Sequence, residues 1–274
     1  GDISIESAWG HYQRVTTPSR GGPCAEGLRR RILGPMRRCL GALLLLSALN
    51  VGGEDLFIPM VGQKQGQDGV WWNTEVWLVN TASSTGGYAA VLLPSGQANV
   101  EGLQAEPPLE DLPPGTTVYR NDLVPQGMTG VLRVLTTSGV LAFARVYSAA
   151  GRGSYGQGVP GLPRSAALRP GEVGHLLGLR RSPQFRTNVV IFNPSTESGV
   201  ARVRLVQYRG EVAGEETYRM AGGAYVQLDD ALHAFGVARG DNLRAEVSGT
   251  VPLLVLASVI DTRSGAPTLV PAQR

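Results

Sequence analysis

Apolar and polar residues alternate with a period of two along several segments of the chain. In 200–206, three apolar residues share one face, and Arg202 and Arg204 share the other. Successive side chains of a β-strand point to opposite faces, so this pattern predicts a half-buried strand. The segment 242–247 has the same alternation and predicts a second strand of this kind. The inward residues are expected to be Ala201, Val203, Leu205, Leu243, Ala245 and Val247.

Two other segments, Val140–Val146 and Val251–Ile260, are apolar on both faces, which predicts strands in the middle of a sheet. Gly, Pro, Asn and Ser residues separate these short segments, a spacing typical of an antiparallel β-sandwich. Asn80 and Asn193 end two predicted strands. Their side chains are expected to bond to the backbone two residues on and so to begin a turn. Asp230 is expected to cap a single helical turn.

A long internal repeat sets the domain organisation. The segment TEVWLVNTASSTGGYAAVLL at 74–93 has a near copy, TNVVIFNPSTESGVARVRLV, at 187–206. The offset of 113 residues changes slightly along the chain, so that Arg133 is matched to Arg244 at an offset of 111. A period of this length corresponds to a whole domain rather than to a solenoid unit. We therefore predict an all-β chain, with two tandem antiparallel β-sandwich (immunoglobulin-like) domains after an N-terminal signal peptide.

The expected boundaries follow from composition. Residues 1–35 are expected to be an upstream or extended leader that is disordered, and 36–53 are expected to be the signal peptide. The first sandwich is placed at 54–161 and the second at 172–274. A linker is expected at 162–171, where Pro, Gly and Arg are frequent.

The segment that starts at Met36 has the order of features that export requires. Arg37 and Arg38 precede a short apolar run at 39–49, and small residues follow it. The run is too short to span a bilayer comfortably. We therefore expect cleavage near Glu54 and no stable membrane span in the mature chain.

Two other interpretations of this region stay open. Residues 29–33, RRRIL, loosely resemble a twin-arginine export signal, which would keep the upstream residues. The apolar run is also compatible with a buried core helix. Either export route places the protein in the periplasm, at the cell surface or outside the cell.

The positive charge is concentrated in the leader. The whole chain carries a net charge of +3, but seven of its arginines and only three acidic residues lie in 1–53; this leaves 18 basic and 19 acidic residues, a net charge of −1, in 54–274. No basic stripe is evident there, so no nucleic-acid partner is expected. Cys24 and Cys39 both lie in the leader, and a mature chain without them can hold no disulfide and no thiolate metal site.

Several short segments resemble repeats found in exported proteins of environmental bacteria. The resemblance covers about Leu56 to Pro271 and rests on the segments FIPMVG, WWNTEVWLVNTASS, VLLPSG, LPPGTT and YGQGVPG. Such repeats are generally uncharacterised. The resemblance implies immunoglobulin-like or fibronectin-like sandwiches and supplies no catalytic residues. The second copy departs from the pattern at 176–178 and 266–268, where LLG and APT replace IPM and YGQ.

Motifs for catalysis or cofactor binding are weak. Gly151–Gly156 has the glycine spacing of a dinucleotide fingerprint, but the residues that follow cannot form the helix that such a site needs. We interpret this segment as a hairpin loop, and the RGD tripeptide at 239–241 as an ordinary loop. His175 and His233 have no second ligand at metal spacing. We expect no catalytic residue, no cofactor and no metal; a triad assembled across the fold, and hence a hydrolase, stays open as a minor alternative.

The tryptophans are the candidate ligand-binding residues. Trp71, Trp72 and Trp77 all lie in the first copy. By alternation, Trp77 points away from Val76 and Leu78 and is expected on the outer face of a sheet. Exposed aromatic side chains can stack on sugar rings or anchor a protein partner. The alternative is that the tryptophans cover the end of the core, with one of Trp71 and Trp72 facing inward.

Two functions from different classes follow. The first is an exported, non-enzymatic structural or adhesive protein that presents a surface to another protein. The second is a carbohydrate-binding module that uses the tryptophans of the first copy to hold a cell-wall or extracellular polysaccharide. Exposure of the tryptophans distinguishes the two, because a flat exposed pair favours sugar binding and burial favours a structural role.

Overall fold

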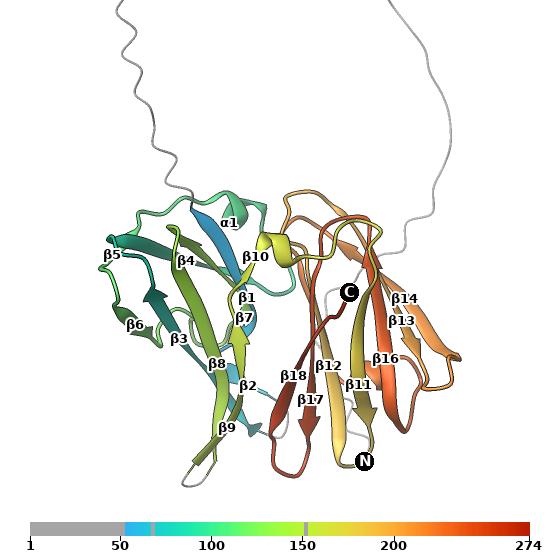
Figure 1. The fold of residues 1–274 in the computed structure, drawn as a ribbon. Coiled ribbons are helices and arrows are strands. Elements are labelled where there is room, and N and C mark those ends of the chain that lie inside the picture. Colours follow the sequence, from blue (N-terminus) through green and yellow to red (C-terminus); the bar gives the residue numbers. More distant parts are fainter. Residues whose placement is uncertain (1–52, 67–68, 151–152) are drawn as a thin grey trace, which may run out of the picture. The chain divides into compact units, whose positions relative to one another are not determined.

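The computed structural model of the protein describes residues 53–66, 69–150 and 153–274 (Figure 1). Within the described residues the chain is built mainly of antiparallel strands in four sheets. The predicted all-β class and antiparallel sandwich architecture are confirmed. The predicted leader and, apart from Gly53, the predicted signal peptide lie outside the described residues.

The first copy forms sheets I and II. Sheet I has the order β10-β1-β7-β4-β5, and sheet II has the order β2-β3-β8-β9 with β6 paired to β3. The strands of sheet I are β1 (Glu54–Gly62), β4 (Gly86–Pro94), β5 (Glu110–Leu112), β7 (Thr129–Thr136) and β10 (Leu162–Pro163). The strands of sheet II are β2 (Lys64–Gln65), β3 (Trp71–Asn80), β6 (Thr117–Arg120), β8 (Val140–Ala150) and β9 (Gly153–Pro160). A short helix, α1 (Val100–Gln104), follows β4.

The second copy forms sheets III and IV. Sheet III has the order β11-β16-β13-β14, and sheet IV has the order β15-β12-β17-β18. The strands of sheet III are β11 (Gly174–Arg181), β13 (Gly199–Val206), β14 (Val212–Met220) and β16 (Gly240–Gly249). The strands of sheet IV are β12 (Phe185–Phe192), β15 (Tyr225–Leu228), β17 (Leu254–Asp261) and β18 (Pro267–Pro271). A single helical turn, α2 (Ala231–Ala234), follows β15.

Apart from the two-residue strands β2 and β10, the two copies share one strand order, so sheet III corresponds to sheet I and sheet IV corresponds to sheet II. The strand registers fix the matching residues. Val91 lies opposite Arg133 in sheet I, and Arg204, which is 113 residues later, lies opposite Glu246 in sheet III. The structural counterpart of Arg133 is therefore Glu246, and the sequence match of Arg133 to Arg244 is wrong by two residues along the strand.

The same threonine contact joins the two sheets of each copy. Thr74 Oγ1 donates to the Gly62 carbonyl at 2.8 Å and accepts from the Gly62 amide at 2.9 Å. Thr187 Oγ1 makes the same pair of bonds with Arg180, at 2.7 and 3.1 Å. A buried hydroxyl thus ties β1 to β3 and β11 to β12, and it satisfies one backbone donor and one backbone acceptor in each case.

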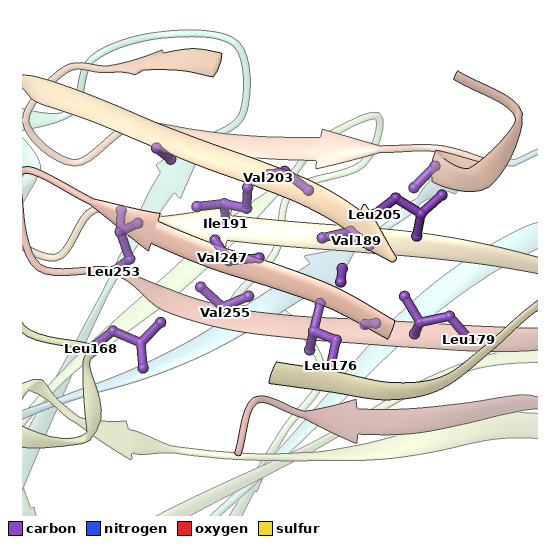
Figure 2. Packing of buried hydrophobic residues seen from close by; sticks show 14 of the residues in the cluster. Leu168, Leu176, Leu179, Val189, Ile191, Val203, Leu205, Val247, Leu253 and Val255 are labelled. Atoms are coloured by element: carbon purple, nitrogen blue, oxygen red, sulfur yellow. The ribbon is translucent and has the colours of Figure 1, made fainter. Parts of the chain in front are cut away.

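Each copy buries its own apolar core between its two sheets. In the second copy, the predicted inward residues of β13 and β16 are all buried in one cluster, as predicted. Figure 2 shows Val203, Leu205 and Val247 from sheet III with Val189 and Ile191 from sheet IV in this cluster. The first copy has a matching cluster that includes Ile58, Val76, Leu78, Leu132 and Val134. Burying each such side chain stabilises the fold by about 1.5–3 kcal/mol.

A third apolar cluster joins the two copies. It contains outward-facing residues of sheet I and sheet IV, with Phe57 and Phe192 at a ring-centroid distance of 5.2 Å. The other buried members are Leu93, Leu103, Val131, Ala167, Val190, Tyr225 and Leu254. A face that is solvated in an isolated sandwich is therefore buried here, and the two copies pack sheet against sheet.

Polar contacts surround this shared cluster. The Asn99 side-chain amide donates to the Gly223 carbonyl at 2.9 Å, and Ser258 Oγ donates to Gln157 Oε1 at 2.9 Å. Arg164 pairs with Asp55 at 2.7 Å and also donates to the Pro194 carbonyl. The bonds of Asn99 and Ser258 link the two copies directly, and Arg164 in the connecting segment bridges them through Asp55 and Pro194. Directional polar contacts thus accompany the apolar ones at this interface.

The segment 162–171, predicted as a linker, has regular contacts with both copies. Leu162 pairs with Phe57 in β1, and Leu168 forms an antiparallel bridge with Leu253. Leu162 also packs against the shared cluster. The connection is therefore a bonded element of the interface.

Candidate binding face

The outer face of sheet II follows from the alternation in β3. Val76 and Leu78 are buried in the core, while Trp77 between them is half-buried on the opposite side. The predicted outward position of Trp77 is thus confirmed. The residues around it decide what this face can bind.

Aromatic side chains form a row across the strands. Trp77 lies opposite Tyr119 in β6 and opposite Phe143 in β8, and Phe143 lies opposite Pro160 in β9. The ring centroids of Trp77 and Tyr119 are 5.6 Å apart, and those of Trp77 and Phe143 are 6.1 Å apart. The ring planes are tilted by 55° and 42°, so the row is a ridged surface rather than a flat platform. Gly158 makes room for it, because a Cβ at this position would lie 2.4 Å from Phe143 Cζ.

The row is accompanied by exposed apolar surface. Tyr119 is 49% exposed, Phe143 is 46% exposed and Leu141 is 58% exposed. A shallow hollow lies beside the row. Its lining includes Leu141 and Phe143 of β8, together with Trp77, Pro160 and Glu54. Adjoining apolar side chains on one sheet face are the kind of surface that marks an interaction site.

Polar groups border the aromatic row. The Tyr119 hydroxyl donates to Glu75 Oε1 at 3.2 Å, and Arg145 Nη1 lies 3.9 Å from the same carboxylate. The Arg145 guanidinium also lies over the Tyr147 ring, 4.7 Å from its centroid. Desolvation, and then the Glu75 carboxylate, raise the pKa of both Tyr119 and Tyr147 above the ordinary value of 10.0. Neutral hydroxyls, one carboxylate and one guanidinium therefore lie beside the aromatic faces.

The structure does not bring the three predicted tryptophans together. Trp71 is 39% exposed and lies on the same side of β3 as Trp77, six residues away, which is about 20 Å along a strand. Trp72 points the other way and packs against the first core, with its ring 6.0 Å from Tyr155 in an edge contact. The expectation that one of the adjacent tryptophans faces inward is confirmed. The residues beside Trp77 are Tyr119 and Phe143, and Leu141 lies next to them opposite Val79; the alternation within β3 alone does not identify these neighbours.

The equivalent face of the second copy is buried. The register matches Trp77, Val79, Leu141 and Phe143 of sheet II to four residues of sheet IV. These counterparts are Val190, Phe192, Leu254 and Leu256, and all four are buried. Three of them belong to the cluster between the copies. Apolar character is thus retained at all four positions of sheet II, although these side chains are exposed or half-buried.

Groups suited to catalysis are dispersed or already paired. In the part of the chain that the structure describes, no cluster of three His, Cys, Asp or Glu side chains is arranged to hold a metal ion. The most connected polar group joins Tyr88, Glu110, Arg120 and Asp122. The hydrogen bond from Tyr88 lowers the pKa of Glu110, and the hydrogen bond from Arg120 lowers the pKa of Asp122. Glu110 is thus stabilised in the charged form by Tyr88 on the neighbouring strand β4, and Asp122 by Arg120 two residues earlier in the chain.

Across residues 53–66, 69–150 and 153–274, no helix is both long enough and apolar enough to cross a membrane.

Comparisons with known proteins do not assign a family. No protein family and no curated protein sequence matches the chain. Among solved structures, the crystal structure of Bacteroides uniformis β-glucuronidase is a match at 9% identity and a TM-score of 0.18, covering 73% of this chain. The chain spans only 24% of that structure, and the likeness carries no inference about activity.

Proposed function

We propose that the chain is an exported, non-enzymatic interaction protein, with a structural or adhesive role, that binds its partner through the outer face of sheet II. One observation supports this proposal above the others. Apolar and aromatic side chains occupy the same positions on this face as on the buried face of sheet IV, yet Leu141 and Phe143 are about half exposed. Exposed apolar surface costs free energy in water, so a face of this composition is best explained by a partner that covers it.

The leader supports the exported location. Paired arginines, a short apolar run and small residues precede Glu54 in the order that export requires. Removal of this segment would leave a chain that begins directly at β1. A partner in the periplasm, on the cell surface or in the extracellular medium follows from that location.

A second candidate function is binding of a cell-wall or extracellular polysaccharide. The row of Tyr119, Trp77 and Phe143, bordered by Glu75 and Arg145, favours it, because sugar rings stack on aromatic faces and their hydroxyls need donors and acceptors. The tilt between the rings favours a single sugar chain over a crystalline surface.

The experiment combines a glycan array with a pull-down on cell-wall material and cell-surface proteins. The purified protein is compared with a Trp77→Ala/Phe143→Ala variant and with Tyr208→Ala as a control. Tyr208 is 66% exposed and lies in the turn between β13 and β14, away from sheet II. We expect the double variant to lose retention and the control to keep it. Equal retention of all three proteins would reject sheet II as the binding surface for a glycan or for another surface protein.

A further inference from the structure

The contact between the two repeats shows that the outer face of sheet IV, the counterpart of sheet II, packs against another β-sheet. Sheet IV is the counterpart of sheet II, and its outer face packs on the outer face of sheet I through Phe57 and Phe192. Since sheet II keeps apolar residues at the positions that sheet IV uses in this contact, it has the chemistry of a sheet-packing face. Two β-sheets pack face to face in the same way inside an ordinary sandwich.

The opposite end of the pair of sandwiches is polar. The register places Arg204 and Arg244 of sheet III where sheet I has Val91 and Val131. Sheet III thus carries charged groups at positions that are apolar in the packed face. Arg204 and Arg244 both pair with Glu246 at 3.1 Å, and Arg202 pairs with Glu215 at 2.6 Å. Stacking sheet II of one molecule on sheet III of another would desolvate these ion pairs, which costs free energy.

From this asymmetry we propose that the outer face of sheet II is a homodimer interface, at which two copies of the chain pack sheet II against sheet II about a two-fold axis. The proposal rests on the proposed role of sheet II as the binding face and names its partner. A chain with one apolar end and one polar end forms a closed pair by this contact, with the polar sheet III facing solvent at both ends. Two-fold dimers with self-complementary surfaces are the commonest closed assemblies.

The charges on the face are self-complementary. Glu75 and Arg145 lie opposite each other on β3 and β8 and are only loosely paired, at 3.9 Å. A two-fold axis makes every contact between the two molecules occur twice. The Glu75 carboxylate of each molecule can therefore pair with the Arg145 guanidinium of the other, which gives two ion pairs. The Trp77 and Phe143 rings then fill the centre of the interface, where aromatic side chains contribute most to binding.

The test is sedimentation velocity of the purified protein over a range of concentrations. We expect a dimer, and a monomer for Phe143→Glu, with an unchanged thermal unfolding midpoint of the monomer because Phe143 is about half exposed. Leu177→Glu is the matched control, since Leu177 is 50% exposed on β11 of sheet III and should leave the dimer intact. Monomeric wild-type protein at every concentration would overturn the proposal.

A charge-swap experiment tests the two-fold arrangement itself. In a dimer of Glu75→Arg, two arginines face each other at both ion-pair sites, and in a dimer of Arg145→Glu two glutamates do so. Each variant alone should therefore be monomeric. An equimolar mixture should form heterodimers, because both pairs become attractive. Failure of the mixture to associate while wild type is dimeric would reject this register of the interface.

The same variants distinguish failure of the homodimer from failure of sheet II as a binding face. A monomeric wild type that binds a polysaccharide or a surface protein, and loses that binding with Phe143→Glu, refutes the homodimer but leaves sheet II as the binding face. A monomeric wild type whose retention does not depend on Phe143 refutes both.

Discussion

Asn80 and Asn193 make the same hydrogen bonds at the same place in the two copies. Asn80 Nδ2 donates to the carbonyls of Ser84 and Leu112, and its Oδ1 accepts from the Ala82 amide. Asn193 Nδ2 donates to the carbonyls of Glu197 and of Met220, the equivalent of Leu112, and also to that of Ala221, and its Oδ1 accepts from the Ser195 amide. Both side chains are fully buried. Each one holds the end of its strand, β3 or β12, against the following turn and against the end of a distant strand, β5 or β14.

Replacing either asparagine with aspartate should therefore destabilise the protein strongly. The carboxylate removes both Nδ2 donors and places a buried negative charge beside two carbonyl oxygens, so a loss of at least about 3 kcal/mol in the free energy of unfolding is expected. Asn80→Asp and Asn193→Asp should behave alike in urea denaturation. Asn121→Asp, at an exposed position, is the control and should change stability by less than about 0.5 kcal/mol. Tolerance of either buried substitution would contradict the role assigned to this bond network.

The role of these asparagines at the ends of their strands is predictable from the sequence because the bond from the amide two residues on is local. A side-chain amide at the end of a strand can satisfy the backbone two residues on, whatever lies farther away. The helical turn after Asp230 was predicted for a similar reason and is present, although Asp230 makes no capping bond and pairs with Arg181 at 3.1 Å instead. Local patterns of this kind need no knowledge of the rest of the fold.

The sequence could not predict which outer faces are buried. Alternation distinguishes the two faces of a strand, and it placed Trp77 correctly on the outer side. It gives no information on whether another sheet covers that side, because Val190 and Trp77 are equally apolar at equivalent positions. The contact between sheets I and IV depends on residues more than 100 positions apart in the chain, such as Phe57 and Phe192, and no local pattern encodes it.

The shared cluster predicts cooperative unfolding of the two copies. Phe192→Ala should cost about 3–5 kcal/mol, as expected for a large buried aromatic side chain. In the fragment 54–274, which lacks Trp9, all tryptophans lie in the first copy, so its tryptophan fluorescence reports the first copy alone. The substitution in the second copy should nevertheless shift the fluorescence midpoint in urea, in step with the far-ultraviolet circular dichroism. An unchanged fluorescence midpoint would show that the copies unfold independently.

Alanine substitutions of the three tryptophans should lower the free energy of unfolding by different amounts. Trp72 packs against the first core, and Trp72→Ala should cost about 3 kcal/mol or more. Trp71 is exposed, and Trp71→Ala should change the free energy of unfolding by less than about 1 kcal/mol. Trp77→Ala should fall between the two when measured on the monomer, because its ring is half-buried on the outer face. Equal effects of Trp71→Ala and Trp72→Ala would contradict their placement on opposite faces of β3.

A pair of glycines allows backbone strain to be measured without steric interference. Gly178 has a φ of +70° in a bulge of β11, and Met60 has a φ of +71° at the equivalent bulge of β1. A Cβ added at Gly178 would meet no atom within 4 Å, and the same holds at Gly153, whose φ lies outside the left-handed region. Gly178→Ala should therefore lower the free energy of unfolding by about 1–2 kcal/mol, the cost of a left-handed backbone for a residue with a Cβ.

Gly153→Ala is the matched control for this substitution. It should be neutral or should raise the free energy of unfolding by up to about 1 kcal/mol, because alanine restricts the unfolded chain without straining the folded one. Urea denaturation of both variants at one temperature gives the comparison. Equal stability of the two variants would show that β11 relaxes out of the left-handed conformation when a Cβ is present.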